Sequence, residues 1–399
     1  MSVYLDHAAT TPVRDVALSA FHDVALLGGN PSSLHGAGRR ARRAVEDARE
    51  QVAAALGVGA AEVVLTAGGT EADNLGVKGL FGARSAEDPA RTRVLASPVE
   101  HHAVLDCVTW LAEARGAEVR WLPVDRRGRV DVDGTAALLA EDPDRTALLT
   151  CMWANNEVGT VQPVHELVEL SHAHGVPVHV DAVQAVGWLD GEVGSLGADT
   201  VAVSGHKLGA PVGSGVLVVR RGVELEPVVH GGGQERGVRS GTVDAPAAAA
   251  LAAALSAAAA ERDVEAPRVA ALRDRLAAGV LALDPTAVVQ GADLHAPGAR
   301  LPTNLHVTFP GCEGDSLLYL FDAHDVAVST GSACRAGVPE PSHVLDAMGV
   351  DAGLARGALR FSLGRTSTDA DVDTALAVLL GVLDRARAAV ARAHGLAAS

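Results

Sequence analysis

One of the two lysines in this chain stands where an amine could do chemistry. Of the 33 lysines and arginines, only Lys78 and Lys207 are lysine, which leaves 31 arginines. Arginine keeps its proton in proteins, whereas a lysine amine can lose it and form a Schiff base with a carbonyl compound. Because arginine serves almost everywhere else, Lys207 is a candidate for such an amine. The alternative, an ordinary lysine on a surface loop, stays open at this point.

An acid and a glycine-rich turn could hold a flat, phosphorylated ligand beside that amine. Asp181 ends an apolar strand candidate, 26 residues before Lys207. Such an acid is commonly a helix cap, but beside a Schiff-base lysine it can keep a pyridinium nitrogen protonated. Residues 68–70, Gly-Gly-Thr, precede a predicted helix, whose first backbone N–H groups favour phosphate. Many strand-to-helix turns share this pattern, so the turn alone does not identify a phosphate site.

The stretch STGSACRAG, residues 329–337, carries Cys334 among small residues. Cysteine is usually buried as a small hydrophobe, but this stretch makes a poor strand and a poor helix. We therefore predict a reactive thiol on a flexible loop. The four cysteines are scattered and form no CxxC pair, which argues against a disulfide framework and against a structural zinc site. We expect no bound metal.

Short apolar runs alternate with helical patterns through the middle of the chain. This alternation predicts an α/β fold with a largely parallel sheet that is buried on both faces. Ligands of such sheets collect at the carboxyl ends of the strands, where Lys207, Asp181 and the 68–70 turn stand. The strand candidates are residues 61–66, 93–97, 146–153, 176–182, 200–205 and 215–220.

An alanine-rich stretch, residues 244–275, predicts a long helix that leads into a second, smaller α/β unit. We expect that unit to close with a helix from about residue 369 to 394. The expected division is a large domain of residues 14–258 and a small domain of residues 1–13 and 259–399. The small domain would carry the mobile cysteine loop, at about residues 326–342.

The bulk composition excludes several classes of partner. The net charge of −16 disfavours nucleic acid and anionic membranes, which attract basic faces. Hydrophobic residues make up 48% and charged residues 21%, as in ordinary globular proteins. The chain contains no long apolar run and no leader-like start, so we expect a cytoplasmic protein without membrane contact.

Ten short blocks, taken together and in order, resemble the cysteine desulfurases of the NifS/IscS type. These enzymes belong to the class V aminotransferase group of fold type I pyridoxal-phosphate enzymes. The resemblance spans essentially the whole chain. The blocks are YLDHAATTP (4–12), GNPSSLH (29–35), TEADN (70–74), EHHAVL (100–105), NNEVGTVQP (155–163), HVDAVQ (179–184), SGHK (204–207), HGGGQERGVRSGT (230–242), STGSAC (329–334) and LRFSLGR (359–365).

The resemblance implies a fold, a cofactor and a reaction. The large domain would hold a mixed, mostly parallel seven-stranded sheet flanked by helices, beside a smaller α/β C-terminal domain. With bound pyridoxal 5'-phosphate, the enzyme would remove sulfur from L-cysteine and give L-alanine and a persulfide on Cys334. The protein would be a homodimer that passes this sulfur to an acceptor protein, either an iron–sulfur scaffold or a thiolation enzyme.

The resemblance also implies roles for individual residues. Lys207 would bind the cofactor and move protons at the substrate Cα, Asp181 would pair with the pyridine nitrogen, and His101 would lie over the ring and transfer protons. Arg360 would bind the substrate carboxylate, a bidentate task that suits a guanidinium group. The other cofactor contacts would be Gln184 at the ring hydroxyl, Asn156 near ring and substrate, and Gly69, Thr70, Ser204, His206 and the neighbouring subunit's Thr242 at the phosphate.

Two other functions compete with desulfuration. One is selenocysteine lyase or another class V reaction such as transamination, and the STGSAC loop argues against a plain transaminase. The other is a non-catalytic scaffold for sulfur transfer, against which the intact set of Lys207, Asp181, His101 and Cys334 argues. Among the departures from the family pattern, Arg335 follows Cys334 where relatives often have a small hydroxyl residue. None of the departures removes a catalytic group.

Overall fold

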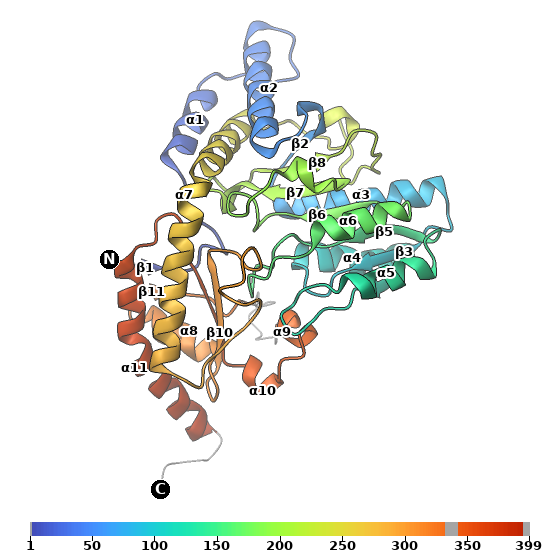
Figure 1. The fold of residues 1–399 in the computed structure, drawn as a ribbon. Helices are drawn as coiled ribbons and strands as arrows, with labels where there is room; N and C mark the ends of the chain where they lie inside the picture. The colour runs from blue at the N-terminus through green and yellow to red at the C-terminus, as the bar shows by residue number, and fades with distance from the viewer. Residues whose placement is uncertain (1, 332–341, 394–399) are drawn as a thin grey trace.

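The computed structural model describes residues 2–331 and 342–393, and a seven-stranded sheet is its largest. Figure 1 shows this sheet with helices on both sides. Its strand order is β2-β8-β7-β6-β5-β3-β4. Neighbouring strands from β7 to β4 pair in parallel, while β8 pairs antiparallel with both β7 and β2. The predicted mixed, mostly parallel sheet is therefore confirmed. The strands are β2 (Val63–Thr66), β3 (Arg93–Ala96), β4 (Glu118–Trp121), β5 (Thr146–Thr150), β6 (Val178–Asp181), β7 (Thr200–Ser204) and β8 (Gly215–Val219).

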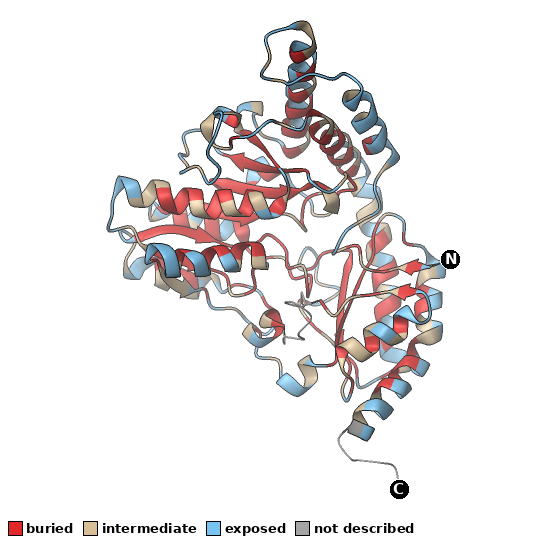
Figure 2. Ribbon diagram, turned by 180° about the vertical axis from the view of Figure 1, so that it is seen from behind, coloured by how far each residue is buried: buried red, intermediate tan, exposed pale blue. Residues whose placement is uncertain are grey.

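Both faces of this sheet are buried, as the continuous apolar strands predict (Figure 2). Side chains alternate along each strand, so Val94 and Leu148 pack into the core beside α3 and α4. Their neighbours Leu95 and Leu149 belong to the opposite core, which includes residues of α2, α5, α6 and α7. These helices are α2 (Gly36–Leu56), α3 (Gly69–Glu87), α4 (His102–Arg115), α5 (Val132–Glu141), α6 (Val164–Ala173) and α7 (Ala245–Leu283).

The long helix α7 connects the sheet to a second core. It begins where the Asp244 carboxylate accepts a hydrogen bond from the Ala247 amide, and Pro246 fits its first turn. Its later residues join a core built with α8, α11, β10 and β12. The division at residues 258 and 259, inside α7, stays a prediction. The remaining elements are β1 (Val3–Tyr4), α1 (Asp15–Ala25), β9 (Val288–Val289), β10 (Asn304–Thr308), α8 (Gly314–Asp322), β11 (Val326–Ala327), α9 (His343–Ala347), α10 (Ala352–Ala355), β12 (Ala358–Ser362) and α11 (Asp369–Ala393).

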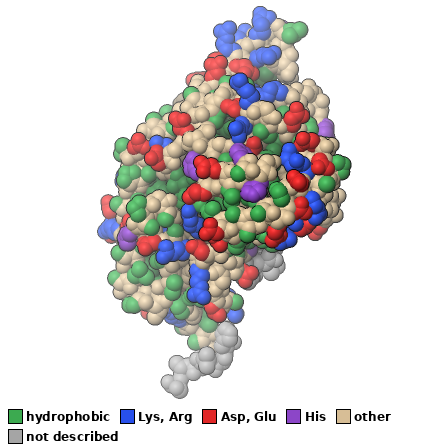
Figure 3. Space-filling view, turned by 45° about the vertical axis from the view of Figure 1, so that its right-hand side comes forward, with side chains coloured by type: hydrophobic (Ala, Val, Ile, Leu, Met, Phe, Trp, Pro, Cys, Tyr) green, Lys and Arg blue, Asp and Glu red, His purple; other side chains and the backbone are tan. Residues whose placement is uncertain are grey.

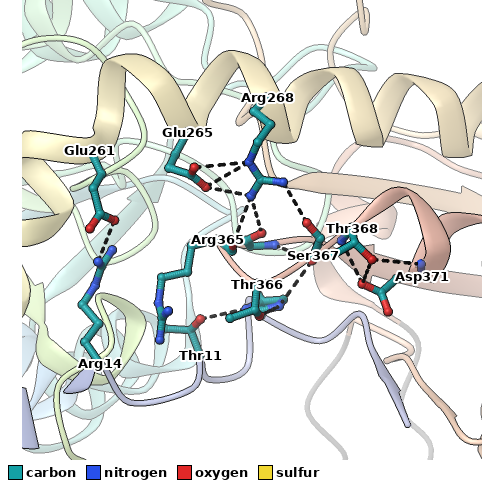
Figure 4. Close-up of polar contacts among 12 residues, drawn as sticks. Thr11, Arg14, Glu261, Glu265, Arg268, Arg365, Thr366, Ser367, Thr368 and Asp371 are labelled. Atoms are coloured by element: carbon teal, nitrogen blue, oxygen red, sulfur yellow. Dashed lines mark hydrogen bonds and ion pairs between the residues drawn. The ribbon is translucent and has the colours of Figure 1, made fainter. Parts of the chain in front are cut away.

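Polar contacts fasten α7 to the N-terminal segment and to the turn after β12 (Figure 4). Arg14 donates to the Glu261 carboxylate at 2.7 Å, and Arg268 donates to the backbone carbonyl of Ser367 at 2.8 Å. Arg365 donates to the carbonyl of Pro12 at 2.9 Å. Residues near both ends of the chain are thereby held beside the middle of one helix. The same N-terminal segment contacts the turn after β7, where the Thr11 amide donates to the His206 carbonyl at 3.3 Å.

Across the described residues, no helix combines the length and the apolar character needed to cross a bilayer. On the face drawn in Figure 3, acidic and basic side chains are interspersed over the body of the molecule.

Candidate active site

A cavity of about 350 Å³ opens at the carboxyl ends of the large sheet's strands. Ten of the twelve residues named from the sequence line it, and they come from separate loops that follow β2, β3, β5, β6 and β7, and from β12. Thr242 does not line it, and Cys334 lies outside the described residues. The ten are Gly69, Thr70, His101, Asn156, Asp181, Gln184, Ser204, His206, Lys207 and Arg360.

Lys207 ends a short helical turn directly after β7, and its amine points at the N-terminal segment. The Lys207 Nζ donates hydrogen bonds to the carbonyl oxygens of Ala8 at 2.5 Å and Ala9 at 2.7 Å. Burial and the nearby Arg360 guanidinium lower the pKa of Lys207 to about 8. A far larger fraction of this amine is therefore unprotonated near neutral pH than of an ordinary lysine amine, and the unprotonated form is the nucleophile. Sequence reasoning missed the two carbonyls, although both belong to the YLDHAATTP block.

Asp181, at the end of β6, is buried in the cavity wall. Its Oδ1 accepts a hydrogen bond from the Val183 amide at 2.8 Å. Burial raises the pKa of Asp181 to about 8, and the neighbouring Asp73 carboxyl adds to this effect. If a pyridine-type ligand bound here, its protonated ring nitrogen would supply the positive charge that the buried Asp181 carboxylate lacks. Asp73 lines the same cavity, lies 3.2 Å from the His179 Nε2, and was not identified from the sequence.

The glycine turn before α3 leaves a recess at the positive end of that helix. A Cβ on Gly69 would lie 2.9 Å from Val183 Cγ2 and 3.1 Å from Ser204 Cβ, so a side chain there would fill the recess. Thr70 and His206 complete its polar lining. Free amides at a helix start together with hydroxyl and imidazole groups suit a phosphate. The residues present therefore fit a phosphorylated, pyridine-type cofactor.

His101 caps the start of α4 and faces the same cavity. Its Nδ1 accepts a hydrogen bond from the Ala103 amide at 3.1 Å, which leaves Nε2 to carry the ring proton. Desolvation in the cavity wall and the Lys207 charge lower the pKa of His101 to about 4. The imidazole is neutral at physiological pH and can accept a proton. Gln184 also lines the cavity, and its Nε2 donates to the Ala8 carbonyl at 3.0 Å.

Arg360 is fixed within β12 by contacts that the sequence did not indicate. Its Nη2 donates to the Asp6 carboxylate at 2.8 Å, and its Nη1 donates to the backbone carbonyl of Asn156 at 3.1 Å. Its side chain is only 5% exposed. The buried Nε has no hydrogen-bond partner among the described residues. A carboxylate that enters the cavity would meet a guanidinium group already held in place.

Thr242 does not join this cluster in its own chain. Thr242 is exposed and lines a different hollow, together with Arg239. Cys334 and Arg335 lie outside the described residues. Ser329 and Gly331, which precede them, and His343, which follows them, all line the cavity. Within residues 2–331 and 342–393, no group of three or more His, Cys, Asp or Glu side chains is placed to hold a metal ion.

Comparisons with known proteins agree with this geometry. The aminotransferase class-V family matches residues 3–375. The chain is 51% identical to an IscS-like cysteine desulfurase of Mycobacterium tuberculosis, over 98% of this chain and 99% of that protein. A solved NifS-like protein superimposes with a TM-score of 0.87 at 36% identity, covering 96% of this chain and all of the other. A structure described as SspA in complex with cysteine gives a TM-score of 0.76 at 32% identity, with 91% of this chain and 99% of that one covered.

The chain therefore belongs to the aminotransferase class-V family and, within it, to the cysteine desulfurases of the NifS/IscS type, which confirms the resemblance of its sequence blocks. Its fold is that of the fold type I pyridoxal-phosphate enzymes, and pyridoxal 5'-phosphate is its cofactor.

Proposed function

We propose that this protein is a cysteine desulfurase that takes sulfur from L-cysteine and leaves L-alanine. The observation that carries the proposal is the convergence of the Lys207 amine, the Asp181 carboxyl and the Arg360 guanidinium on one cavity. The similarity to curated cysteine desulfurases along nearly the whole chain supports the same reaction.

Some of the residues that line the cavity would contact the ring of the cofactor, and the others would contact its phosphate. Lys207 holds pyridoxal phosphate through its amine, Asp181 pairs with the ring nitrogen, and Gln184 and Asn156 lie beside the ring. Gly69, Thr70, Ser204 and His206 receive the phosphate in the recess at the start of α3. When bound, the cofactor withdraws electrons from the substrate Cα.

The chain's own groups then bind the substrate and move its protons. Arg360 binds the carboxylate and thereby fixes the Cα beside Lys207. Lys207 and the neutral His101 transfer protons at the substrate carbon atoms. The Cys334 thiolate attacks the substrate sulfur, so that a sulfur–sulfur bond forms while the substrate's carbon–sulfur bond breaks. The electron pair of the broken bond stays with the carbon, which takes a proton to become the methyl group of alanine.

We also propose that two copies of the chain form a homodimer with shared sites. Thr242 lies outside its own chain's cavity, so its role at a phosphate requires a second subunit. Exposed apolar side chains around α1 are consistent with a covered face, since Leu26 is 73% and Leu34 is 88% exposed.

The sulfur acceptor would be an iron–sulfur scaffold or a thiolation enzyme. A cytoplasmic location stays a prediction from the sequence.

The purified protein, loaded with pyridoxal phosphate and given L-cysteine, is expected to release alanine in step with the sulfur transferred to a thiol acceptor. Amino-acid analysis and sulfide detection measure the two products. Alanine formed efficiently from selenocysteine and not from cysteine would favour a selenocysteine lyase. Alanine formed from neither compound would favour the non-catalytic scaffold.

Arg360→Lys is expected to weaken substrate binding more than cofactor binding. A lysine keeps the charge but cannot make the paired, planar contact with a carboxylate. Loss of a charge-assisted hydrogen bond at a buried site corresponds to about a 10- to 100-fold rise in KM for L-cysteine. Steady-state kinetics measure this rise, and the absorbance of bound cofactor should stay unchanged. Arg356→Lys, at an exposed position in the same part of the chain, is the control. An unchanged KM in Arg360→Lys would contradict the assignment.

A further inference from the structure

The loop between β8 and α7 contains a backbone conformation that most residues avoid. Glu235 and Arg236 have φ angles of 46° and 58°, in the left-handed region that favours glycine. Only Asp325 shares this property among the described non-glycine residues. Strained backbone persists where the surroundings hold it, so two such residues in succession indicate a loop with a fixed shape.

A buried carboxylate holds the strained part of the loop. The Glu235 side chain is 3% exposed, and its two oxygens accept hydrogen bonds from Arg49 Nη2 at 2.7 Å and Nη1 at 2.8 Å. The same carboxylate accepts a hydrogen bond from the Leu65 amide at 2.8 Å. Arg49 belongs to α2, while Leu65 belongs to β2, the strand that leads into the glycine turn at residue 68. Glu235 therefore ties the loop to two elements of the large domain.

A second ion pair ties the later part of the loop to the start of α3. Arg239 Nε lies 2.7 Å from Glu71 Oε1, and its Nη2 lies 3.2 Å from Oε2. Glu71 follows Thr70 directly and also accepts a hydrogen bond from the Ala67 amide. Close to the end of the loop, the Gly241 amide donates to Gln234 Oε1 at 2.9 Å. The residue after Gly241 is the exposed Thr242.

We propose that Glu235, clamped by Arg49, and Arg239, paired with Glu71, are positioning residues that act across the dimer. They hold residues 230–242 as a preformed arm, which presents Thr242 to the cofactor phosphate of the other subunit. An arm fixed before binding loses little conformational entropy when it meets that phosphate. This inference rests on the homodimer of the proposed function, and it adds the residues that position the shared contact.

Two mixed dimers test whether the arm serves the other subunit. In the first, one chain carries Glu235→Gln and its partner carries Lys207→Ala. In the second, one chain carries both substitutions and its partner is wild type. Each dimer keeps one lysine-bearing site, but only the first lets an intact arm from the other chain reach it. The readout is retained pyridoxal phosphate, fixed to Lys207 by borohydride after dialysis and quantified by mass spectrometry.

The first dimer is expected to retain cofactor like the wild type, and the second to bind it about tenfold more weakly. The reverse order would mean that the arm serves its own chain, and equal retention would mean that Glu235 only stabilises the fold. Either result overturns the inference while leaving desulfuration intact. A wild-type chain that sediments as a monomer would instead overturn the homodimer itself.

Two further variants separate positioning from general stability. Asp284→Asn removes another buried carboxylate, 5% exposed and paired with Arg387, far from the loop in the chain. It should lower the melting temperature without loosening the cofactor. If Glu235→Gln does not fold, Arg239→Gln replaces it in both mixed dimers, because the Arg239–Glu71 pair is partly exposed and its loss is milder.

Discussion

Lys207→Arg is expected to abolish covalent attachment of the cofactor and to slow desulfuration by at least about 10²- to 10⁴-fold, the range of a lost proton-transfer group. Arginine preserves the positive charge and could still donate to the carbonyls of Ala8 and Ala9. It cannot lose its proton, however, whereas burial brings the pKa of Lys207 to about 8. The substitution therefore removes only the property that the chemistry needs.

The chain offers a matched control in its only other lysine. Lys78 donates to Asn74 Oδ1 at 2.7 Å, and its Nζ lies 4.5 Å from the centre of the Trp110 ring. Lys78→Arg keeps the charge that both contacts use, so attachment and turnover should be unchanged. Borohydride reduction followed by peptide mass spectrometry locates the attached cofactor. Attachment that survives in Lys207→Arg, or that maps to Lys78, would refute the assignment.

The sequence predicts most of the large sheet because its strands are local, apolar runs. Residues 146–150 and 200–204 are completely buried in β5 and β7, and each run can be recognised without its partners. The edge strand β4, Glu118–Trp121, was not predicted from the sequence. Its side chains are half-buried or exposed, and Glu118 and Arg120 take part in surface ion pairs. An edge strand of this kind has no continuous apolar run to identify it.

Residue type and position at strand ends pointed to Lys207, Asp181 and Gly69, and the ten ordered blocks pointed to the other cavity residues, Arg360 included. The contacts between distant segments that hold such residues in place were not predictable. Arg360 donates a hydrogen bond to Asp6, although the two residues are 354 positions apart in the sequence. Arg49 donates to Glu235 across 186 positions. Both arginines belong to a residue type that is abundant in this chain, so neither stands out by composition. Only the packing of α2, β2 and the N-terminal segment brings such pairs together.

The three described cysteines are poor candidates for carrying sulfur. A thiol must be deprotonated to attack, and burial raises the pKa of Cys107 to about 12 and that of Cys312 to about 11. Burial also raises the pKa of Cys151 well above its ordinary value. All three side chains lie inside the protein, away from any acceptor. Cys334, whose neighbours Gly331 and His343 line the cavity, is the remaining thiol.

Cys334→Ser is accordingly expected to eliminate the protein-bound persulfide and to reduce sulfur transfer to an acceptor by at least about 100-fold. Serine has nearly the same shape, but its hydroxyl is not ionised at neutral pH and cannot hold a transferable sulfur. Intact mass spectrometry after incubation with L-cysteine should show one added sulfur atom on the wild type and none on the variant. Cys312→Ser, at a buried thiol in the same part of the chain, should still gain the sulfur atom.

A Cys334→Ser protein that gains the sulfur would place the acceptor thiol elsewhere. Pyridoxal phosphate retained in that variant would show that Lys207 and Asp181 work independently of the thiol, because Cys334 acts only after the substrate has been bound.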